Sequence, residues 1–198
     1  MGLPVFYLIH SYFMADFSQS HKSPILTKNI LTIVFSFLTI IGAKIQVQVW
    51  EIPFTLQTIA VYGSGIFLGW QWGGLSQLIY LFLGLFFPVF AGEGQGVDYL
   101  LNRTTSGYLL SFPVVSAITG FLSQKWKSAG GNFISLQAGS LTLFAAGVLW
   151  LHFAANHPSW EYSLVNGWIK FIPVDQLKIL TVWLIYLGMK HKFVMYSR

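Results

Sequence analysis

The 198-residue chain contains no cysteine, and Asp, Glu, Lys and Arg together make up only 9% of it. The absence of cysteine excludes disulfide bonds, thiolate metal sites and a cysteine nucleophile, and it leaves the redox compartment undetermined. Soluble domains carry about 25% charged residues, so this chain lacks the polar surface that a water-soluble fold needs. Hydrophobic residues make up 55% of the chain and aromatic residues 18%. This composition predicts an integral membrane protein.

The formal net charge of +5 does not point to nucleic acid. Nucleic-acid-binding surfaces gather Lys and Arg into stripes or runs, often with stacking aromatic residues between them. The sequence has no Arg-rich run and no such stripe. Nucleic acid is therefore excluded as a partner.

Long uncharged stretches set the number of membrane crossings that the chain can make. A bilayer core about 30 Å thick needs roughly 20 helical residues per crossing. The uncharged stretches cover residues 29–43, 52–92, 104–124 and 133–153. The second stretch has 41 residues, enough for two crossings, and we expect the turn between them at residues 70–74. These stretches predict five spans.

A sixth span has to include charged residues. Only 11 uncharged residues separate Lys178 from Lys190, so we expect the helix to begin at Pro173, a residue type favoured in the first helical turn. That start places Asp175 and Lys178 on one face, about one turn apart. Ionisable groups within a span usually face the bundle interior or a watery cavity. The pair predicts either a polar ligand site or an ion pair at the helix end.

Loop charges predict the orientation of this all-α, six-helix membrane protein. With six spans, the side that holds both termini carries seven basic residues and one acid, and the opposite side carries four basic residues and five acids. Because cytoplasmic loops are enriched in Lys and Arg, both termini are predicted to be cytoplasmic and the ligand pocket to face outward from the plasma membrane. The predicted organisation is an interfacial or flexible segment at residues 1–27, a transmembrane substrate-binding domain at 28–190 and a cytoplasmic tail at 191–198.

The connection between the third and fourth predicted spans is rich in glycine. Gly92, Gly94 and Gly96 permit backbone bends, but the strand, helix and Lys-Ser/Thr of a phosphate-binding loop are missing. Arg103 follows in the same loop and offers a planar fork for a carboxylate or a ureido oxygen. We expect this loop to form a mobile lid, and the alternative is an ordinary hairpin between helices.

Two features of the second predicted span leave alternatives open. Gln57 lies inside an apolar segment and can both donate and accept, either to a ligand or to a neighbouring helix. Gly65, Gly69 and Gly73 follow one another at intervals of four residues, a stripe that suits close packing against a neighbouring helix or a partner protein.

An enzymatic alternative depends on Ser64, which lies between Gly63 and Gly65. An intramembrane serine protease needs a histidine on a neighbouring span at the depth of the serine. His152 and His157 lie at or beyond the end of the fifth predicted span, and no two histidines have the i, i+4 spacing of a helical zinc site. We therefore predict no catalytic residues, no metal and no cofactor. A structural protein whose polar groups only fasten helices is a further alternative.

Four stretches of the sequence carry a resemblance to a known family. They are PFTLQTIAV at 53–61, the glycine-bounded segment 63–84, PVFAG at 88–92 followed by TSGYLLSFP at 105–113, and PVDQLK at 173–178. In this order and spacing they resemble BioY, the biotin-specific substrate-binding (S) subunit of energy-coupling factor (ECF) transporters. The likeness covers most of the chain from Lys28 to Met189.

The resemblance implies a six-helix subunit, not an enzyme, that captures biotin with high affinity in an outward-facing pocket under a loop lid. In that family a transmembrane coupling subunit and two cytoplasmic ATPases drive uptake, so these are the implied partners besides biotin and the lipid bilayer. An S subunit for another vitamin is the nearest alternative. Two departures are the Arg103–Tyr108 segment, where the family usually has Pro-Thr-Gly-Gly-Tyr, and the missing alanine pair for docking, with only Thr39 and Ala43 at small-residue spacing.

The chemistry of biotin matches these residue types. Biotin has two ureido N–H donors, one carbonyl acceptor, an apolar bicycle and a carboxylate on a flexible tail. Asp175 can accept from the ureido nitrogens, and Lys178 or Arg103 can meet the carboxylate or the ureido oxygen. The predicted ligand-binding residues are Asp175, Lys178, Arg103, Gln57, Asn102, Tyr108, Phe90, Gly92, Thr105 and Gly107.

Overall fold

The apolar segments of the chain form long helices in the computed structural model, which describes residues 24–47, 54–155 and 159–193. The long helices are α2 (Pro24–Lys44), α3 (Gln57–Phe86), α5 (Ser106–Lys125), α6 (Ala129–Phe153) and α8 (Ile172–Phe193). The short elements are an antiparallel pair, β1 (Gln46–Val47) and β2 (Phe54–Thr55), the helices α4 (Gly96–Asn102) and α7 (Trp160–Gly167), and the 3-10 helix η1 (Ile169–Phe171).

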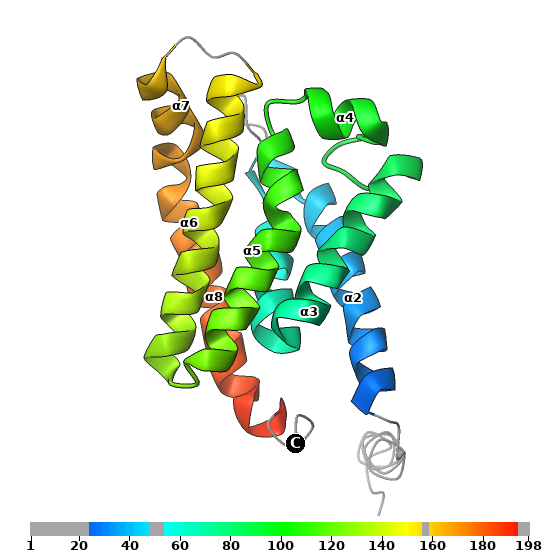
Figure 1. Ribbon diagram of the computed structural model, residues 1–198, viewed down its shortest axis with the longest axis vertical. Helices are drawn as coiled ribbons and strands as arrows, with labels where there is room; N and C mark the ends of the chain where they lie inside the picture. The colour runs from blue at the N-terminus through cyan, green and yellow to red at the C-terminus, as the bar shows by residue number, and fades with distance from the viewer. Residues whose placement is uncertain (1–23, 48–53, 156–158, 194–198) are drawn as a thin grey trace, which may run out of the picture.

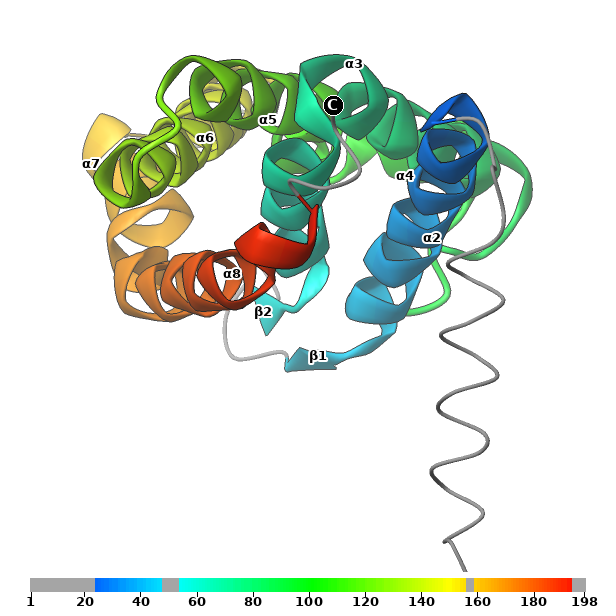
Figure 2. The ribbon, with the colours of Figure 1, turned by 90° about the horizontal axis from the view of Figure 1, so that it is seen from below.

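The long helices run along the long axis of the molecule, and the short elements gather at one end (Figure 1). α4 and α7 lie at this end, and the connection between α5 and α6 lies at the opposite end. Seen along the axis, α2 lies beside α3 at one side and α7 beside α6 at the other (Figure 2). Consecutive helices pack against each other, α2 on α3, α3 on α5 and α5 on α6. The fold is a bundle of helices with one elaborated end.

Within the described residues, four segments are long and apolar enough to cross a membrane. They are Ile25–Lys44, Ser106–Lys125, Ala129–Phe153 and Trp160–Met189. On α2, the large side chains of Ile33, Phe37 and Ile41 are exposed, whereas Ser36 and Thr39 are buried against the bundle. An apolar outer face with small polar residues inside is expected where lipid is the solvent, because helix contacts there depend on close packing and hydrogen bonds. The predicted class, an all-α membrane protein, is confirmed, with the small β1–β2 pair as an addition.

The two predicted spans in residues 52–92 are the two helical limbs of α3, which reverses direction at Gly69. Gly69 breaks the helical path with φ 80° and ψ −179°, and the two limbs then run side by side. Gln77 of the second limb donates to Ser64 Oγ of the first at 3.1 Å, and the Gln57 amide donates to the Tyr80 hydroxyl. The turn therefore lies at Gly69, just before the predicted 70–74 segment.

Glycine is needed at this turn for two separate reasons. A positive φ disfavours every residue with a Cβ, so the backbone at Gly69 requires glycine. At Gly73, a Cβ would lie 2.8 Å from the Ser64 carbonyl oxygen and 3.0 Å from Gly65 Cα. Gly65 and Gly73 thus face each other across the turn, and they are not one continuous stripe on a straight helix. A partner protein is not needed to explain the spacing.

Several boundaries differ from those that the sequence predicts. α8 begins at Ile172, one residue before the predicted start at Pro173. The predicted lid contains a short helix, α4, and the connection before α8 contains α7 and η1. The sequence did not predict these elements, because so few residues are too short for a helical periodicity to show. Of the predicted segment at residues 1–27, residues 24–27 form the first turn of α2 and the rest lies outside the described residues.

We expect Gly69→Ala to lower the stability of the protein by about 1–3 kcal/mol, the usual strain of a side chain held at such a backbone angle. The new Cβ would also meet the Gln124 side chain. Thermal unfolding in detergent measures the change. Gly130→Ala is the matched control, because nothing lies within 4 Å of its added Cβ. Equal midpoints for the two variants would contradict this account of the turn.

Candidate functional site

A pocket opens among the helices and receives residues from almost every element of the fold. β2, α3, α5, α6 and α8 all contribute, together with α4, η1 and the loop that precedes α4. The lining residues are Phe54, Thr55, Gln57, Thr58, Ala91, Tyr99, Thr105, Tyr108, Leu109, Phe112, Leu143, Phe144, Phe171, Val174, Asp175 and Lys178. Five of these, Gln57, Thr105, Tyr108, Asp175 and Lys178, are among the ten residues that the sequence predicts. The pocket is mainly apolar, with a few polar side chains, as is typical of small-molecule sites.

Asp175 is the least exposed of the polar residues that line the pocket. Its side chain is only 3% exposed. Oδ1 accepts a hydrogen bond from the Tyr62 hydroxyl at 2.9 Å, and Oδ2 accepts one from Ser140 Oγ at 2.6 Å. Tyr62 lies on α3 and Ser140 on α6, so the carboxylate joins three helices. Each oxygen has a second lone pair, so the group can still accept from a ligand.

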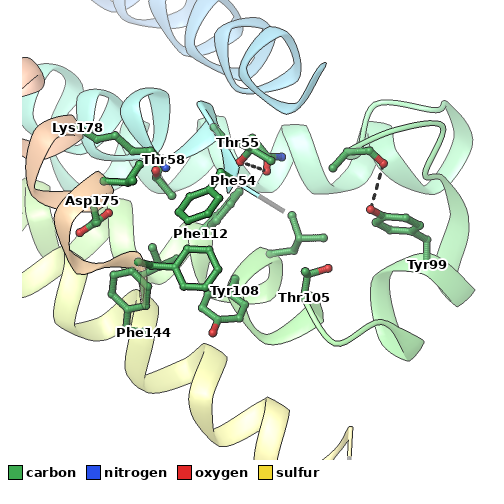
Figure 3. A pocket seen from close by; sticks show the side chains of 16 residues that line it. Phe54, Thr55, Thr58, Tyr99, Thr105, Tyr108, Phe112, Phe144, Asp175 and Lys178 are labelled. Carbon is green, nitrogen blue, oxygen red and sulfur yellow. Dashed lines mark hydrogen bonds between the residues drawn. The ribbon is translucent and has the colours of Figure 1, made fainter. Parts of the chain in front are cut away.

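Lys178 lies one turn further along α8 and also lines the pocket. Among the described residues, no carboxylate or other acceptor lies within bonding distance of its Nζ, so the helix-end ion pair with Asp175 is not formed. Both side chains project from α8 into the pocket (Figure 3). An ammonium without an acceptor in an apolar setting is energetically unfavourable. A ligand in the pocket can therefore supply the hydrogen-bond acceptor that Lys178 lacks among the described residues.

Two residues near the start of α3 supply further polar atoms. Thr58 Oγ1 is buried and has no hydrogen-bond partner among the described residues. The Gln57 side chain is 4% exposed, and its amide donates to Tyr80 while its oxygen accepts from Thr55 Oγ1 at 3.0 Å. Gln57 thus forms a hydrogen bond between the two limbs of α3 and lines the pocket at the same time. Thr58 has the greater unused capacity for a ligand.

Aromatic side chains form much of the pocket wall. In Figure 3, the rings of Phe112, Tyr108 and Phe144 lie between Asp175 at one end and Tyr99 at the other. The Tyr108 hydroxyl donates to the Gly167 carbonyl oxygen, which fixes the ring between α5 and α7. The pocket is therefore elongated, with its acid and amine at one end.

Three predicted residues are close to the pocket without lining it. Phe90 is fully buried, and its ring stacks on Tyr99 with centroids 5.3 Å apart. The Arg103 guanidinium lies 5.1 Å from the centroid of the same Tyr99 ring. Burial raises the pKa of the Tyr99 phenol, and Arg103 counteracts part of that rise. Gly92, with φ 64°, bends the loop next to the lining residue Ala91.

The remaining two predicted residues have other contacts. Asn102 is exposed, and its side chain donates to Asp98 Oδ1 at 2.7 Å within α4. Gly107 lies where α5 meets α6, and a Cβ there would come within 2.7 Å of the Ala146 carbonyl oxygen. Neither residue is brought to the pocket. Asn102 was predicted from its residue type and Gly107 from the family resemblance. In the structure Asn102 contacts Asp98 within α4, and Gly107 lies in the contact between α5 and α6.

Ser64, on which the enzymatic alternative depends, forms hydrogen bonds that join helical segments. Its side chain is fully buried, and its Oγ lies 2.8 Å from Ser116 Oγ and 3.1 Å from the Gln77 amide nitrogen. None of these partners is a histidine. The arrangement lacks the base that a serine nucleophile requires.

Tyr62 and Ser140, the two hydroxyl donors to Asp175, are not among the residues that the sequence predicts. A signal for them is present in the spacing. Tyr62 follows Thr58 by four residues, and Ser140 precedes Phe144 by four, so each shares a helix face with a lining residue. Tyrosine and serine are common in this chain, however, so the spacing becomes meaningful only when the lining residues are known.

A largely apolar pocket with one buried carboxylate and one ammonium, set among helices able to cross a membrane, defines a membrane protein that binds a small organic molecule. The model of the BioY family matches residues 14–194. The chain belongs to the BioY family.

Curated relatives and a solved structure agree with this assignment. A probable biotin transporter BioY of Pyrococcus horikoshii is 34% identical over 156 residues, which are 78% of this chain and 91% of the relative. The biotin transporter BioY of Thermotoga maritima is 32% identical over 158 residues, 79% of this chain and 92% of the relative. A crystal structure of the S-component for biotin from an ECF-type ABC transporter has the same fold, with a TM-score of 0.80, 24% identity, and coverage of 89% of this chain and 98% of that one.

We expect Ser140→Ala to destabilise the protein by about 1–3 kcal/mol, because the buried Asp175 carboxylate would lose a donor. Thr142→Val on the same helix is the control, since that hydroxyl donates only to the Ala138 carbonyl of its own helix. Thermal unfolding in detergent compares the two variants. A loss for Thr142→Val as large as that for Ser140→Ala would show that the Asp175 contact is not the cause.

Proposed function

We propose that this chain captures biotin at the cell membrane as the substrate-binding component of a vitamin transporter. The observation that carries the proposal is a pair of charged residues in one aromatic pocket. Asp175 is buried but can accept further hydrogen bonds, and Lys178 donates no hydrogen bond to any of the described residues. Membership of the BioY family and the names of the curated relatives support biotin as the ligand. The chain is a multi-pass membrane protein and not an enzyme.

The ureido ring of biotin matches the end of the pocket that holds the acid and the amine. Its two N–H groups need acceptors, and its carbonyl oxygen needs a donor. Asp175 supplies a charged acceptor, and Lys178, one turn away, supplies a charged donor. The Thr58 hydroxyl adds a third polar atom that has no partner among the described residues. We assign the ureido ring to this end.

The carboxylate tail of biotin would then point toward the other end, where Tyr99 lies. Arg103 is stacked on Tyr99 and is exposed, so its guanidinium can reach a carboxylate at the rim. The apolar bicycle and the tail would lie between the two ends, against Phe112, Tyr108 and Phe144. In this arrangement Arg103 acts from the rim, and Phe90 and Gly92 act indirectly by supporting Tyr99 and Ala91.

The proposed topology has six helical crossings, namely α2, the two limbs of α3, α5, α6 and α8. Both termini lie in the cytoplasm, and the pocket opens outward. The elaborated end with α4 and α7 lies opposite the α5–α6 connection, which carries Lys125 and Lys127 (Figure 1). That distribution of positive charge favours the α5–α6 connection as the cytoplasmic side.

The proposed partners are a transmembrane coupling subunit and two cytoplasmic ATPases, as the solved S-component comes from an ECF-type ABC transporter. Thr39 and Ala43, the pair of α2 that the sequence places at small-residue spacing, are fully buried in the bundle, so they are not available for docking. The outer face of α2 instead presents Ile33, Phe37 and Ile41. A coupling subunit that docks on α2 would meet these branched and aromatic side chains.

An S subunit for another vitamin is the remaining alternative, and direct titration distinguishes it. We expect the purified protein to bind biotin with a sub-micromolar Kd and to bind vitamins without a ureido ring far more weakly. Asp175→Asn should weaken biotin binding roughly tenfold or more, because a charge-assisted hydrogen bond is lost.

Asp98→Asn is the matched control for this titration, since Asp98 is exposed and its side chain accepts a hydrogen bond from Asn102 within α4, away from the pocket. Its affinity for biotin should equal that of the wild type. Wild-type protein that binds no biotin would refute the proposed function. An unchanged affinity in Asp175→Asn would refute the assigned role of the carboxylate.

The absence of cysteine makes the topology testable without background labelling. Single cysteines at Asp98 on α4 and at Lys127 after α5 would lie on opposite sides of the membrane. In intact cells, we expect a membrane-impermeant maleimide to label Asp98→Cys and to label Lys127→Cys only after the cells are opened. The reverse pattern would invert the proposed orientation.

A further inference from the structure

The ammonium of Lys44, at the C-terminal end of α2, is held by three carbonyl oxygens of one loop. Nζ donates to the carbonyl oxygens of Pro88, Phe90 and Gly92, the second at 3.1 Å. An ammonium has three N–H donors, so this set of contacts uses all of them. No carboxylate is among its partners in the described part of the chain. The Lys44 side chain therefore binds the backbone of the loop between α3 and α4.

That loop forms part of the pocket wall. Ala91, a lining residue, lies between two of the carbonyl groups that Lys44 holds. The Ala91 carbonyl oxygen accepts a hydrogen bond from the Tyr99 hydroxyl at 3.1 Å, and Tyr99 also lines the pocket. The Phe90 ring stacks on Tyr99 with an interplanar angle of 12°. The position of Ala91 and that of Tyr99 are thus linked.

A second part of the wall begins at the same corner. Directly after Lys44, β1 pairs with β2, with Gln46 opposite Thr55 and Val47 opposite Phe54. Thr55 and Phe54 both line the pocket. Lys44 therefore lies where the α2–α3 connection and the α3–α4 loop meet, and its three hydrogen bonds join them.

We propose that Lys44 is a positioning residue that fastens the α3–α4 loop to the end of α2 and so keeps Ala91 and Tyr99 in the wall of a pocket closed over its ligand. The proposal rests on the proposed function for the identity of that ligand. A fastened wall slows escape of the bound molecule, so Lys44 acts on the dissociation rate. Direct contact of Lys44 with the ligand carboxylate is the competing explanation, and it requires at least one of the three carbonyl contacts to break.

The first experiment measures biotin binding kinetics on the full chain in detergent. Lys44→Met keeps the length and the apolar stem of the side chain and removes the donors. We expect biotin to dissociate roughly tenfold faster from this variant, the scale of a lost charge-assisted hydrogen bond, with an association rate that is unchanged or higher. Lys44→Arg, which retains charge and donors, should restore most of the difference. Lys28→Met, at the other end of α2, should behave as the wild type.

The second experiment separates positioning from direct contact. Biotinamide has an uncharged tail but the same ureido ring and bicycle. A positioning role predicts that Lys44→Met speeds the dissociation of biotin and biotinamide by the same factor. Acceleration confined to biotin would overturn the proposal, because it would place Lys44 on the carboxylate.

The third experiment needs no ligand. Within the loop, the Phe90 amide donates to the Gly94 carbonyl and the Gly94 amide to the Ala91 carbonyl. Hydrogen exchange over residues 87–95 of the ligand-free protein should be faster in Lys44→Met than in wild type or Lys28→Met. Unchanged exchange would overturn the proposal. If the wild type fails to bind biotin, the proposed function fails, and the exchange measurement still decides whether Lys44 fastens the loop.

Discussion

The buried carboxylate of Asp175 is the constraint around which the bundle is arranged. A charged group within a membrane protein must be met by donors from the protein, because lipid offers none. Tyr62 from α3 and Ser140 from α6 supply those donors. The three helices that meet at Asp175 all line the pocket. The same contacts that make the charge tolerable therefore hold the walls of the binding site at a set separation.

The rest of the bundle uses weaker polar contacts of the same kind. Hydrophobic burial does not bring helices together in lipid, so small residues and hydrogen bonds have to do so. Ser36 donates to the Ser76 carbonyl oxygen at 2.6 Å, and Thr39 donates to Gln77 Oε1 at 3.2 Å, which fastens α2 to the second limb of α3. Ser64 and Ser116 join the first limb to α5. These buried contacts leave the large apolar side chains free to face outward.

The sequence predicts best those parts of the protein for which any other arrangement would have a much higher free energy. The uncharged lengths predicted the long helices. The position of Asp175 and Lys178 inside an apolar helix predicted either a ligand site or an ion pair, and position alone did not decide between the two. Loop residues were less predictable. Arg103 and Asn102 had suitable chemistry, but the short helix α4 directs Asn102 to Asp98 and stacks Arg103 on Tyr99. Seven residues of helix leave no periodic signal, and the hydroxyl partners Tyr62 and Ser140 are too common in type to stand out.

Asp175 and Lys178 differ in the hydrogen bonds that they form within the protein, and this difference bears on which ligand the pocket can bind. Asp175 already accepts two hydrogen bonds, whereas Lys178 has no acceptor among the described residues. A ligand that brings an oxygen acceptor can accept a hydrogen bond from Lys178, and a ligand that also brings N–H donors can use the remaining lone pairs of Asp175. Under the proposed function, the acid and the amine together favour a molecule that carries an acceptor and N–H donors on the same small ring.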